Sequence, residues 1–548
     1  MSKVLTYLGK TNVVTGLGFG TANNYKLMLS AADGLHPISI APHPWLTRLE
    51  AMMVSVIADV AECVDLSSER TAFIFSTTKG NIANLSTDIP EPQSNIFLHN
   101  MAMRVCRAVG YKGNPIVVSN ACISGVLAVI IAHRLLQANL YDDIVVVGGD
   151  EMTEFTTSGF MAFKSVSSQP CRPYDAQRDG LSLGEAAGAI LLTQHKEKSE
   201  GIVLAGGAAS NDANHISGPS RTGEPLAEAM KQAMKEAHVA PTDISFVNAH
   251  GTATIYNDEM ESKAMALAEL SSCPINSLKP FIGHTLGASG VVEIAIAAEE
   301  LKHGVLIGTK GFEHIGTPVE LNVSASNRAL SMKHCLKSAS GFGGCNAAIV
   351  LSKEEYAHSS PTTKKKTPII RSIKSCTMQN GQMNIDGQIV AQTDANFATF
   401  ARDIYHQTEA NLKFFKMSNL CKMGYLAAEY MMGGAVEQPY STAIVLSNRS
   451  ASLDADLLHW RIQKVDNQPA SPAAFVYTLA NIVMGEIAIR HQIKGETTFF
   501  IADTPADDVA TNYAHLLLNQ GKYQYVLTGW CELLADQYNL HLELLTNK

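Results

Sequence analysis

The stretch Ser-Asn-Ala-Cys-Ile-Ser-Gly at residues 119–125 places a cysteine between an apolar run and a helical pattern. The strand-like residues 115–118 precede it, and the apolar residues 126–132 continue with helical spacing to about Gln137. The N–H groups at the start of a helix favour a thiolate and can receive the oxyanion that forms when sulfur attacks a carbonyl. Because most buried cysteines are inert, this stretch alone leaves both catalysis and packing open for Cys122.

Two histidines stand beside glycine at the ends of other predicted elements. His250 lies in Asn-Ala-His-Gly-Thr-Ala-Thr (248–254), after a strand-like run, and His284 lies in the segment 279–290, which leads into an apolar helix. A neutral imidazole can donate a hydrogen bond toward a developing negative charge, while glycine lets a substrate approach closely. Taken singly, either histidine could equally be structural.

Cys122, His250 and His284 together form a set that, with the turn Gly-Phe-Gly-Gly at 341–344, resembles the β-ketoacyl-acyl carrier protein synthases, condensing enzymes of the thiolase superfamily. The resemblance covers about residues 1–355, and further matching stretches follow the family's order at 13–18, 171–175, 178–180 and 184–188. It implies an α/β chain with the thiolase-like layered α-β-α-β-α fold of two related halves.

The resemblance also assigns roles to the residues that would do the chemistry. Cys122 is expected to be the acylated nucleophile, and His250 and His284 the pair that supports decarboxylation. Lys279 is expected to orient and stabilise charge, paired with Glu293.

Other positions match supporting and substrate-binding residues of the family. Phe342 matches the aromatic gate beside the cysteine, and its backbone N–H, with that of Cys122, would receive the oxyanion. The remaining expected residues are Thr252 and Thr254 as phosphopantetheine contacts, Gly343 as a substrate-binding residue and Glu185 as a supporting one. No metal ligands are expected.

These motifs predict an acyltransferase (EC 2.3.1 class) that condenses an acyl thioester with malonyl-acyl carrier protein in fatty acid, polyene or polyketide-type biosynthesis. Two alternatives remain: a coenzyme A thiolase, disfavoured because thiolases use a second catalytic cysteine late in the chain, and a non-catalytic chain-length partner, against which Cys122 argues. No cofactor is expected, since the substrates ride on the phosphopantetheine of acyl carrier protein.

Several departures from the family pattern leave the acyl preference open. Residues 338–340 read Ser-Ala-Ser, Cys345 replaces a common hydroxyl, and Ile255 follows Thr254 where the family has proline. The loop 76–81 stands where the common fatty-acid enzymes carry a glycine-rich segment near the acyl tunnel. Compact synthases with such a loop resemble those of aryl-polyene or flexirubin-type pigment pathways.

Composition limits the partners and the compartment. The 548 residues are 46% hydrophobic and 17% charged with net charge −9, which fits buried α/β layers and gives no support for nucleic-acid binding. An acidic carrier protein would need a local basic patch. The ten cysteines show no zinc or disulfide spacing, and neither a signal peptide nor a membrane span is evident, which predicts a cytoplasmic protein. We expect a homodimer, or a heterodimer with a related synthase.

The chain is expected to divide into four parts. Residues 1–197 form the half that carries Cys122, 198–355 the half that carries both histidines, 356–368 a polar linker, and 369–548 a degenerate third half.

The third half is predicted from its likeness to the first. Aligning Gly495 with Gly113 sets Thr504 opposite Cys122, and residues 525–532 resemble 144–151. Since the nucleophile and the following insertion are absent and no second half follows, we expect a folded, non-catalytic module. It could cover apolar surface, or serve carrier docking or chain-length control.

Overall fold

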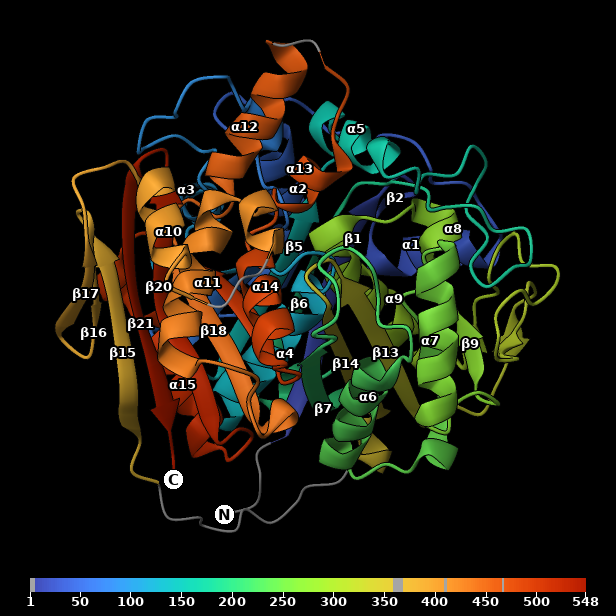
Figure 1. The fold of residues 1–548 in the computed structure, drawn as a ribbon. Helices are drawn as coiled ribbons and strands as arrows, with labels where there is room; N and C mark the ends of the chain where they lie inside the picture. The colour runs from blue at the N-terminus through green and yellow to red at the C-terminus, as the bar shows by residue number, and fades with distance from the viewer. Residues whose placement is uncertain (1–4, 358–367, 409–411, 466–467) are drawn as a thin grey trace.

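The computed structural model describes residues 5–357, 368–408, 412–465 and 468–548. Nineteen strands of these residues form one mixed sheet that runs through the molecule, and two more form a separate ladder. In Figure 1 the C-terminal elements (orange to red) and residues 198–355 (green to olive) flank the N-terminal half.

The first half forms five sheet positions in the order β4-β3-β5-β6-β1, with β3 parallel to β4 and β5, and β6 antiparallel to β5 and β1. All eight residues of β5 are buried because helices cover both faces of this part of the sheet. Its main elements are β1 (Thr6–Thr15), α2 (Arg48–Ala61), β3 (Thr71–Ser76), α3 (Leu98–Ala108), β4 (Ile116–Val118), α4 (Ser124–Gln137), β5 (Asp143–Asp150), α5 (Glu154–Ala162) and β6 (Ala186–Thr193).

The second half brings its own central helix against α4. Its elements are β7 (Ile202–Asn211), α6 (Glu224–Ala237), β8 (Ile244–Asn248), α7 (Ile255–Leu267), β9 (Pro274–Asn276), α8 (Lys279–Ile282), α9 (Ser289–His303), β13 (His334–Gly341) and β14 (Cys345–Lys353). At the start of α9, a Cβ on Gly290 would come within 2.3 Å of Val126 N, and one on Gly125 within 2.7 Å of Val291 N. These glycines therefore let the starts of α4 and α9 touch, which brings the segments of Cys122 and His284 together.

Residues 369–548 repeat the topology of the first half. Strands β19-β18-β20-β21-β15 follow the same order with the same directions as β4-β3-β5-β6-β1. The elements are β15 (Arg371–Gln379), β16 (Gln382–Ile385), β17 (Gln388–Gln392), α10 (Phe397–Tyr405), α11 (Asn419–Met432), β18 (Thr442–Asn448), α12 (Leu453–Lys464), α13 (Pro472–Val476), α14 (Ile482–His491), β19 (Thr497–Ile501), α15 (Val509–Asn519), β20 (Tyr525–Leu534) and β21 (Gln537–Thr546).

This repeat confirms the predicted fold class, including the degenerate third half. The hairpin between β20 and β21 contains only residues 535 and 536, whereas residues 151–185 separate β5 from β6 in the first half. Most of the predicted linker, residues 358–367, lies outside the described residues.

The two copies of the half meet through their equivalent strands. β19 pairs antiparallel with β4, with Val118 opposite Phe500 and Val117 opposite Ile501. The sequence alignment that equates Gly113 with Gly495 also equates Val118 with Phe500. Val118 therefore lies opposite its own counterpart in the other copy. The copies are therefore related by an approximate twofold axis at this point, and the exposed edge that β4 would present is covered within the chain.

Two buried ion pairs also join the copies. Arg134 on α4 contacts Glu496 at 2.7 Å, and Lys79 contacts Asp456 on α12 at 2.6 Å. None of the described helices combines the length and apolar character needed to cross a bilayer.

Candidate active site

Cys122 lies on the sharp turn between β4 and α4. Ala121 adopts a left-handed conformation (φ 47°), which a non-glycine residue enters at some cost. The Ser124 hydroxyl holds this turn, because it accepts from Asn120 N–H at 2.7 Å and donates to Ala121 O at 2.6 Å. Cys122, a partly exposed residue, is thereby fixed at the head of α4.

The Cys122 thiol is protonated at neutral pH. Desolvation raises its pKa to about 12, and the Lys279 ammonium opposes this rise only in part. The expectation from sequence that the helix start favours a thiolate stays a prediction, and burial acts in the opposite direction. Attack by Cys122 therefore requires the loss of this proton.

His250 and His284 stand together and are buried. Their rings are 5.2 Å apart between centroids and nearly perpendicular, at 86°. Burial and the Lys279 cation lower both pKa values, that of His284 to about 3 and that of His250 well below its ordinary value. Both imidazoles are therefore neutral across the physiological range.

The neighbours of each imidazole also select its tautomer. Leu286 N–H points at His284 Nδ1 at 3.3 Å, and the Lys279 ammonium lies 3.4 Å from His250 Nδ1. Because both neighbours can only donate, each Nδ1 must accept, and the ring proton resides on Nε2. The site thus holds two neutral Nε2–H donors, which suits stabilisation of an anionic oxygen.

A buried cation-carboxylate cluster lies beneath the histidines. Lys279 donates to Glu293 Oε1 at 2.8 Å and to His250 O at 2.5 Å, so Lys279 and Glu293 lie in contact. Lys337 contacts the other oxygen of Glu293 at 2.6 Å. Sequence reasoning missed Lys337, although it directly precedes the unusual Ser-Ala-Ser at 338–340.

Two buried carboxylates that sequence reasoning also missed hold the catalytic loops. Glu261 on α7 accepts from the backbone N–H groups of His250 and Gly251, both at 2.8 Å. Asp150, at the end of β5, accepts from Thr78 N–H at 2.9 Å and from Gly287 N–H at 2.7 Å. The loops on both sides of the site are thereby fixed to rigid elements.

The glycine-rich turn 341–344 lies against Cys122. A Cβ on Gly341 would come within 3.1 Å of Cys122 N, so glycine leaves this N–H accessible. Gly343 has φ 87°, a conformation that favours glycine. The oxyanion role of the Cys122 and Phe342 N–H groups stays a prediction.

Residues of the third half complete this part of the site. Asn481 donates to Phe342 O at 2.8 Å and thereby fixes the turn from the opposite side. A cavity of about 20 Å³ beside Cys122 is lined by Thr78, Lys79, Ala121, Cys122, Thr156, Phe160, Leu286, Phe342, Phe475 and Leu479. The last two belong to the third half, and the first two belong to the loop 76–81 that the sequence associates with the acyl tunnel.

Three predicted residues contribute through local contacts. Thr252 and Thr254 join their hydroxyls at 2.9 Å, and their role toward phosphopantetheine stays a prediction. Glu185 accepts from Ile38 N–H at 2.6 Å and Met152 N–H at 3.1 Å and pairs with Arg48, so its contacts hold two loops. No cluster of potential metal ligands occurs among the described residues.

Comparison with known families matches most of the first two halves. The family described as "Beta-ketoacyl synthase, N-terminal domain" matches residues 68–198, and "Beta-ketoacyl synthase, C-terminal domain" matches residues 201–313.

Individual relatives come from bacteria and yeast. A putative polyketide beta-ketoacyl synthase 1 of Streptomyces virginiae is 32% identical over 282 residues, which cover 49% of this chain and 67% of that protein. The 3-oxoacyl-[acyl-carrier-protein] synthase 2 of Rhizobium meliloti is 35% identical over 43% of this chain and 59% of its own length. A putative mitochondrial 3-oxoacyl-[acyl-carrier-protein] synthase of Schizosaccharomyces pombe is 28% identical over 63% of this chain and 93% of its own length. The chain thus spans about two thirds or less of these two bacterial relatives.

Solved structures share the fold. A beta-ketoacyl synthase from Burkholderia phymatum STM815 has a TM-score of 0.58 at 22% identity and covers 64% of this chain and 99% of its own. A structure titled "PfaC Keto synthase-Chain length factor" has a TM-score of 0.77 at 13% identity and covers 99% of this chain and 78% of its own. The second likeness extends over the third half as well as the first two.

Proposed function

This chain belongs to the β-ketoacyl synthase family, and from that premise we propose that residues 1–355 catalyse decarboxylative condensation of an acyl thioester with malonyl-acyl carrier protein. The observation that carries this proposal is the pair of neutral Nε2–H donors of His250 and His284, beside Cys122 and above Lys279. The relatives' names place the family in fatty acid and polyketide synthesis.

The first step would transfer the acyl group to Cys122. Sulfur attacks the thioester carbonyl as the thiol loses its proton, the tetrahedral intermediate expels the carrier's pantetheine thiolate, and that thiolate takes up the proton. The raised pKa of the Cys122 thiol means that the proton leaves during the attack and not before it. The backbone N–H groups of Cys122 and Phe342 would hold the oxyanion.

The second step would use the histidines as donors. The bond between the malonyl carboxylate and its α-carbon breaks, carbon dioxide leaves, and the electron pair forms an enolate whose oxygen faces the two Nε2–H groups. The enolate carbon then attacks the acyl carbonyl on Cys122, forming the new carbon–carbon bond and breaking the bond to the cysteine sulfur, and the released thiolate takes up a proton from water. No separate cofactor enters this sequence.

We infer that residues 369–548 act as an internal partner of the condensing unit. β19 pairs with the edge of β4, while Phe475 and Leu479 line the cavity beside Cys122. The cavity, about 20 Å³, has room for a group little larger than one water molecule. We therefore propose that the resting site favours a short acyl group and that the third half limits acyl length.

The same contact limits the surface through which a dimer could form. The edge of β4 that could pair with a second synthase is already occupied by β19 of the same chain, so the expected homodimer or heterodimer would have to use another surface. Acyl carrier protein remains the proposed partner, and a cytoplasmic setting is part of the proposal.

The two chemical steps can be separated experimentally. His250→Ala and His284→Ala should each reduce carbon dioxide release from labelled malonyl-acyl carrier protein by about 10²–10³-fold, since each removes a positioned donor. Some acyl transfer to Cys122 should persist in each variant. His303→Ala, at the exposed end of α9, is the matched control. Normal decarboxylation in both variants would contradict the proposed role of these histidines.

A further inference from the structure

A second buried lysine lies in the cluster beneath the histidines. Lys337, on the central strand β13, is fully buried, and its ammonium lies 2.6 Å from Glu293 Oε2. It also donates to Ser338 O at 2.8 Å and Ala249 O at 3.3 Å. Each of these partners is an oxygen, and Ala249 directly precedes His250.

Glu293 divides its carboxylate between two cations. Oε1 accepts from Lys279, and Oε2 contacts Lys337. An unpaired carboxylate oxygen would be free to draw the Lys279 ammonium into a two-oxygen contact, away from His250. Occupation of Oε2 by Lys337 therefore keeps Lys279 in the position where it also reaches His250 O and Nδ1.

Other charged groups face this cluster from α7 and α9. Glu261 lies nearby on α7, but its oxygens accept from the backbone N–H groups of His250 and Gly251 and from hydroxyl groups. Burial raises the pKa of Glu300 on α9 to about 8, so this carboxyl is largely protonated at neutral pH. The two lysines are therefore the cations that act on the histidines.

The electrostatic effect of both lysines on the imidazoles has the same sign. Burial is the main cause of the lowered pKa of His250. Lys279, the neighbouring His284 and Lys337 lower this pKa further. At His284 the two lysines again lower the pKa, while Glu293 raises it. A positive charge next to an imidazole disfavours its protonation and leaves the neutral ring as a donor.

We propose that Lys337 is a positioning residue of the condensation site, which acts through Glu293 and Lys279 to keep His250 and His284 as neutral Nε2–H donors toward the enolate. The inference rests on the proposed function, because it assigns Lys337 to the decarboxylation step. It goes beyond the motif, since Lys337 contacts neither Cys122 nor the imidazole rings in the described contacts.

The test is the pH dependence of decarboxylation in Lys337→Met. We expect the rate at neutral pH to fall about 10-fold, less than for loss of a direct donor. We also expect the rate to decline at acid pH at a value about one pH unit higher than in the parent, because the histidine pKa values rise when a nearby cation is removed. Acyl transfer to Cys122 should change less than about 3-fold. Lys353→Met, at the far end of the neighbouring strand β14, is the matched control.

A second pair of variants keeps the test informative if Lys337→Met folds poorly, since Glu293→Gln/Lys337→Met removes one cation together with one anion and so keeps the net charge of the buried cluster. Glu293→Gln and Glu293→Gln/Lys337→Met differ only at Lys337. On acidification, the decarboxylation rate of the double variant should decline at a higher pH than that of Glu293→Gln. Ring ¹⁵N shifts of His250 and His284 measure the same pKa change without substrate. If the parent releases no carbon dioxide, the proposed function fails, while these shifts still test Lys337. Unchanged histidine pKa values with equal losses of both chemical steps would overturn the inference.

Discussion

The first half of the chain and residues 369–548 share one sheet order, yet only the first half carries a cysteine at the turn after the equivalent strand. In the first half, the turn after β4 carries Cys122 behind a left-handed Ala121, at the start of a helix whose residues 124–136 are all buried. In the third half, the turn after β19 carries the exposed Thr504, whose N–H bonds to Asp507 at 3.0 Å. The fold alone therefore does not make a site.

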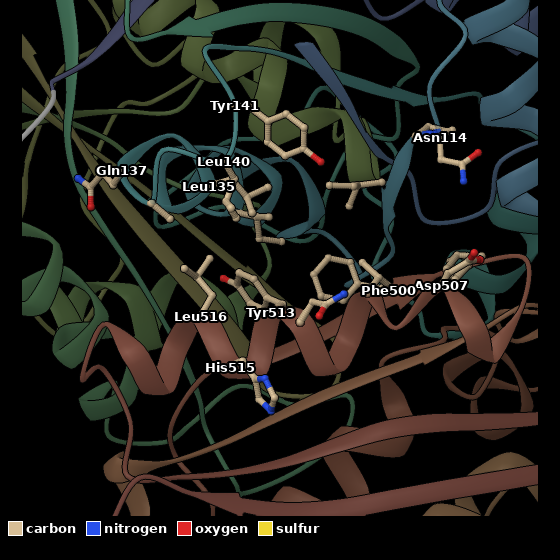
Figure 2. A pocket seen from close by; sticks show the side chains of 18 of the residues that line it. Asn114, Leu135, Gln137, Leu140, Tyr141, Phe500, Asp507, Tyr513, His515 and Leu516 are labelled. Atoms are coloured by element: carbon tan, nitrogen blue, oxygen red, sulfur yellow. The ribbon is translucent and has the colours of Figure 1, made fainter. Parts of the chain in front are cut away.

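The two copies also differ in what covers their central helix. α9 packs against α4 and brings His284 to Cys122, whereas α15 lies across a groove of about 930 Å³ from the C-terminal part of α4. Figure 2 shows Tyr141 and Leu135 on one side of this groove and Tyr513 and Leu516 of α15 on the other. The described part of residues 369–548 contains no counterpart of residues 198–355, so no pair equivalent to His250 and His284 is built at their turn. What the third half retains is the strand pairing with β4 and the wall beside Cys122.

Removal of residues 369–548 should have the largest effect. It would expose the edge of β4 and the side chains packed against β19, and it would remove the carboxylate partners of Arg134 and Lys79. We expect aggregation or altered oligomerisation, measured by size-exclusion chromatography with light scattering. The proposal of an internal partner would be contradicted if a fragment of residues 1–368 stays monodisperse, keeps the oligomeric state of the full chain and turns over normally.

Arg134→Met should weaken the contact between the copies at a point remote from the chemistry. The change leaves Glu496 buried without its cation, which costs about 3–5 kcal/mol. Denaturant unfolding should detect this loss, and Arg134→Met/Glu496→Leu should recover part of it. Arg402→Met, which breaks an exposed pair, should stay within about 0.5 kcal/mol. Equal losses in the single and double variants would argue against the pair as the cause.

Phe475→Ala should change the choice between long and short acyl groups more than it changes the rate of turnover of the folded protein. Loss of this ring enlarges the cavity beside Cys122, so hexanoyl transfer should gain about 10-fold relative to acetyl transfer, a typical value for a few methylenes in an apolar pocket. Competition between the two acyl carriers measures this ratio. Phe415→Ala, an exposed ring of the same half, serves as the control. An unchanged ratio would remove the third half from acyl selection.

Thr504→Ala should have the smallest effect. Its side chain is exposed and contacts only the short turn that follows it, so turnover should remain within about twofold of the parent. A large loss of condensation would mean that the third half takes part in the chemistry.

The sequence pointed to the candidate site residues because each belongs to a contiguous motif. Cys122, His250, His284, Lys279 and Glu293 are all found beside characteristic glycines or at fixed spacing. The copy in residues 369–548 was predicted from the alignment of Gly495 with Gly113 and from the likeness of residues 525–532 to 144–151.

Other features depend on packing between distant segments. Asn481 and Phe475 reach the site only because β19 pairs with β4, a contact that no local pattern encodes. Lys337 is a charged residue on a buried strand, and only the folded structure shows that Glu293 neutralises it. The thiol pKa could not be judged from the helix start, because desolvation in the assembled site raises it.

The most direct test is intact-protein mass spectrometry of the full chain after exposure to an acyl carrier protein loaded with a short acyl group, followed by peptide mapping. The account predicts one acyl group per chain, on Cys122, and none in Cys122→Ala. Acylation at Cys345, or at a cysteine of residues 369–548, or condensation retained by Cys122→Ala, would contradict the claim that one copy performs the chemistry while the other builds its pocket.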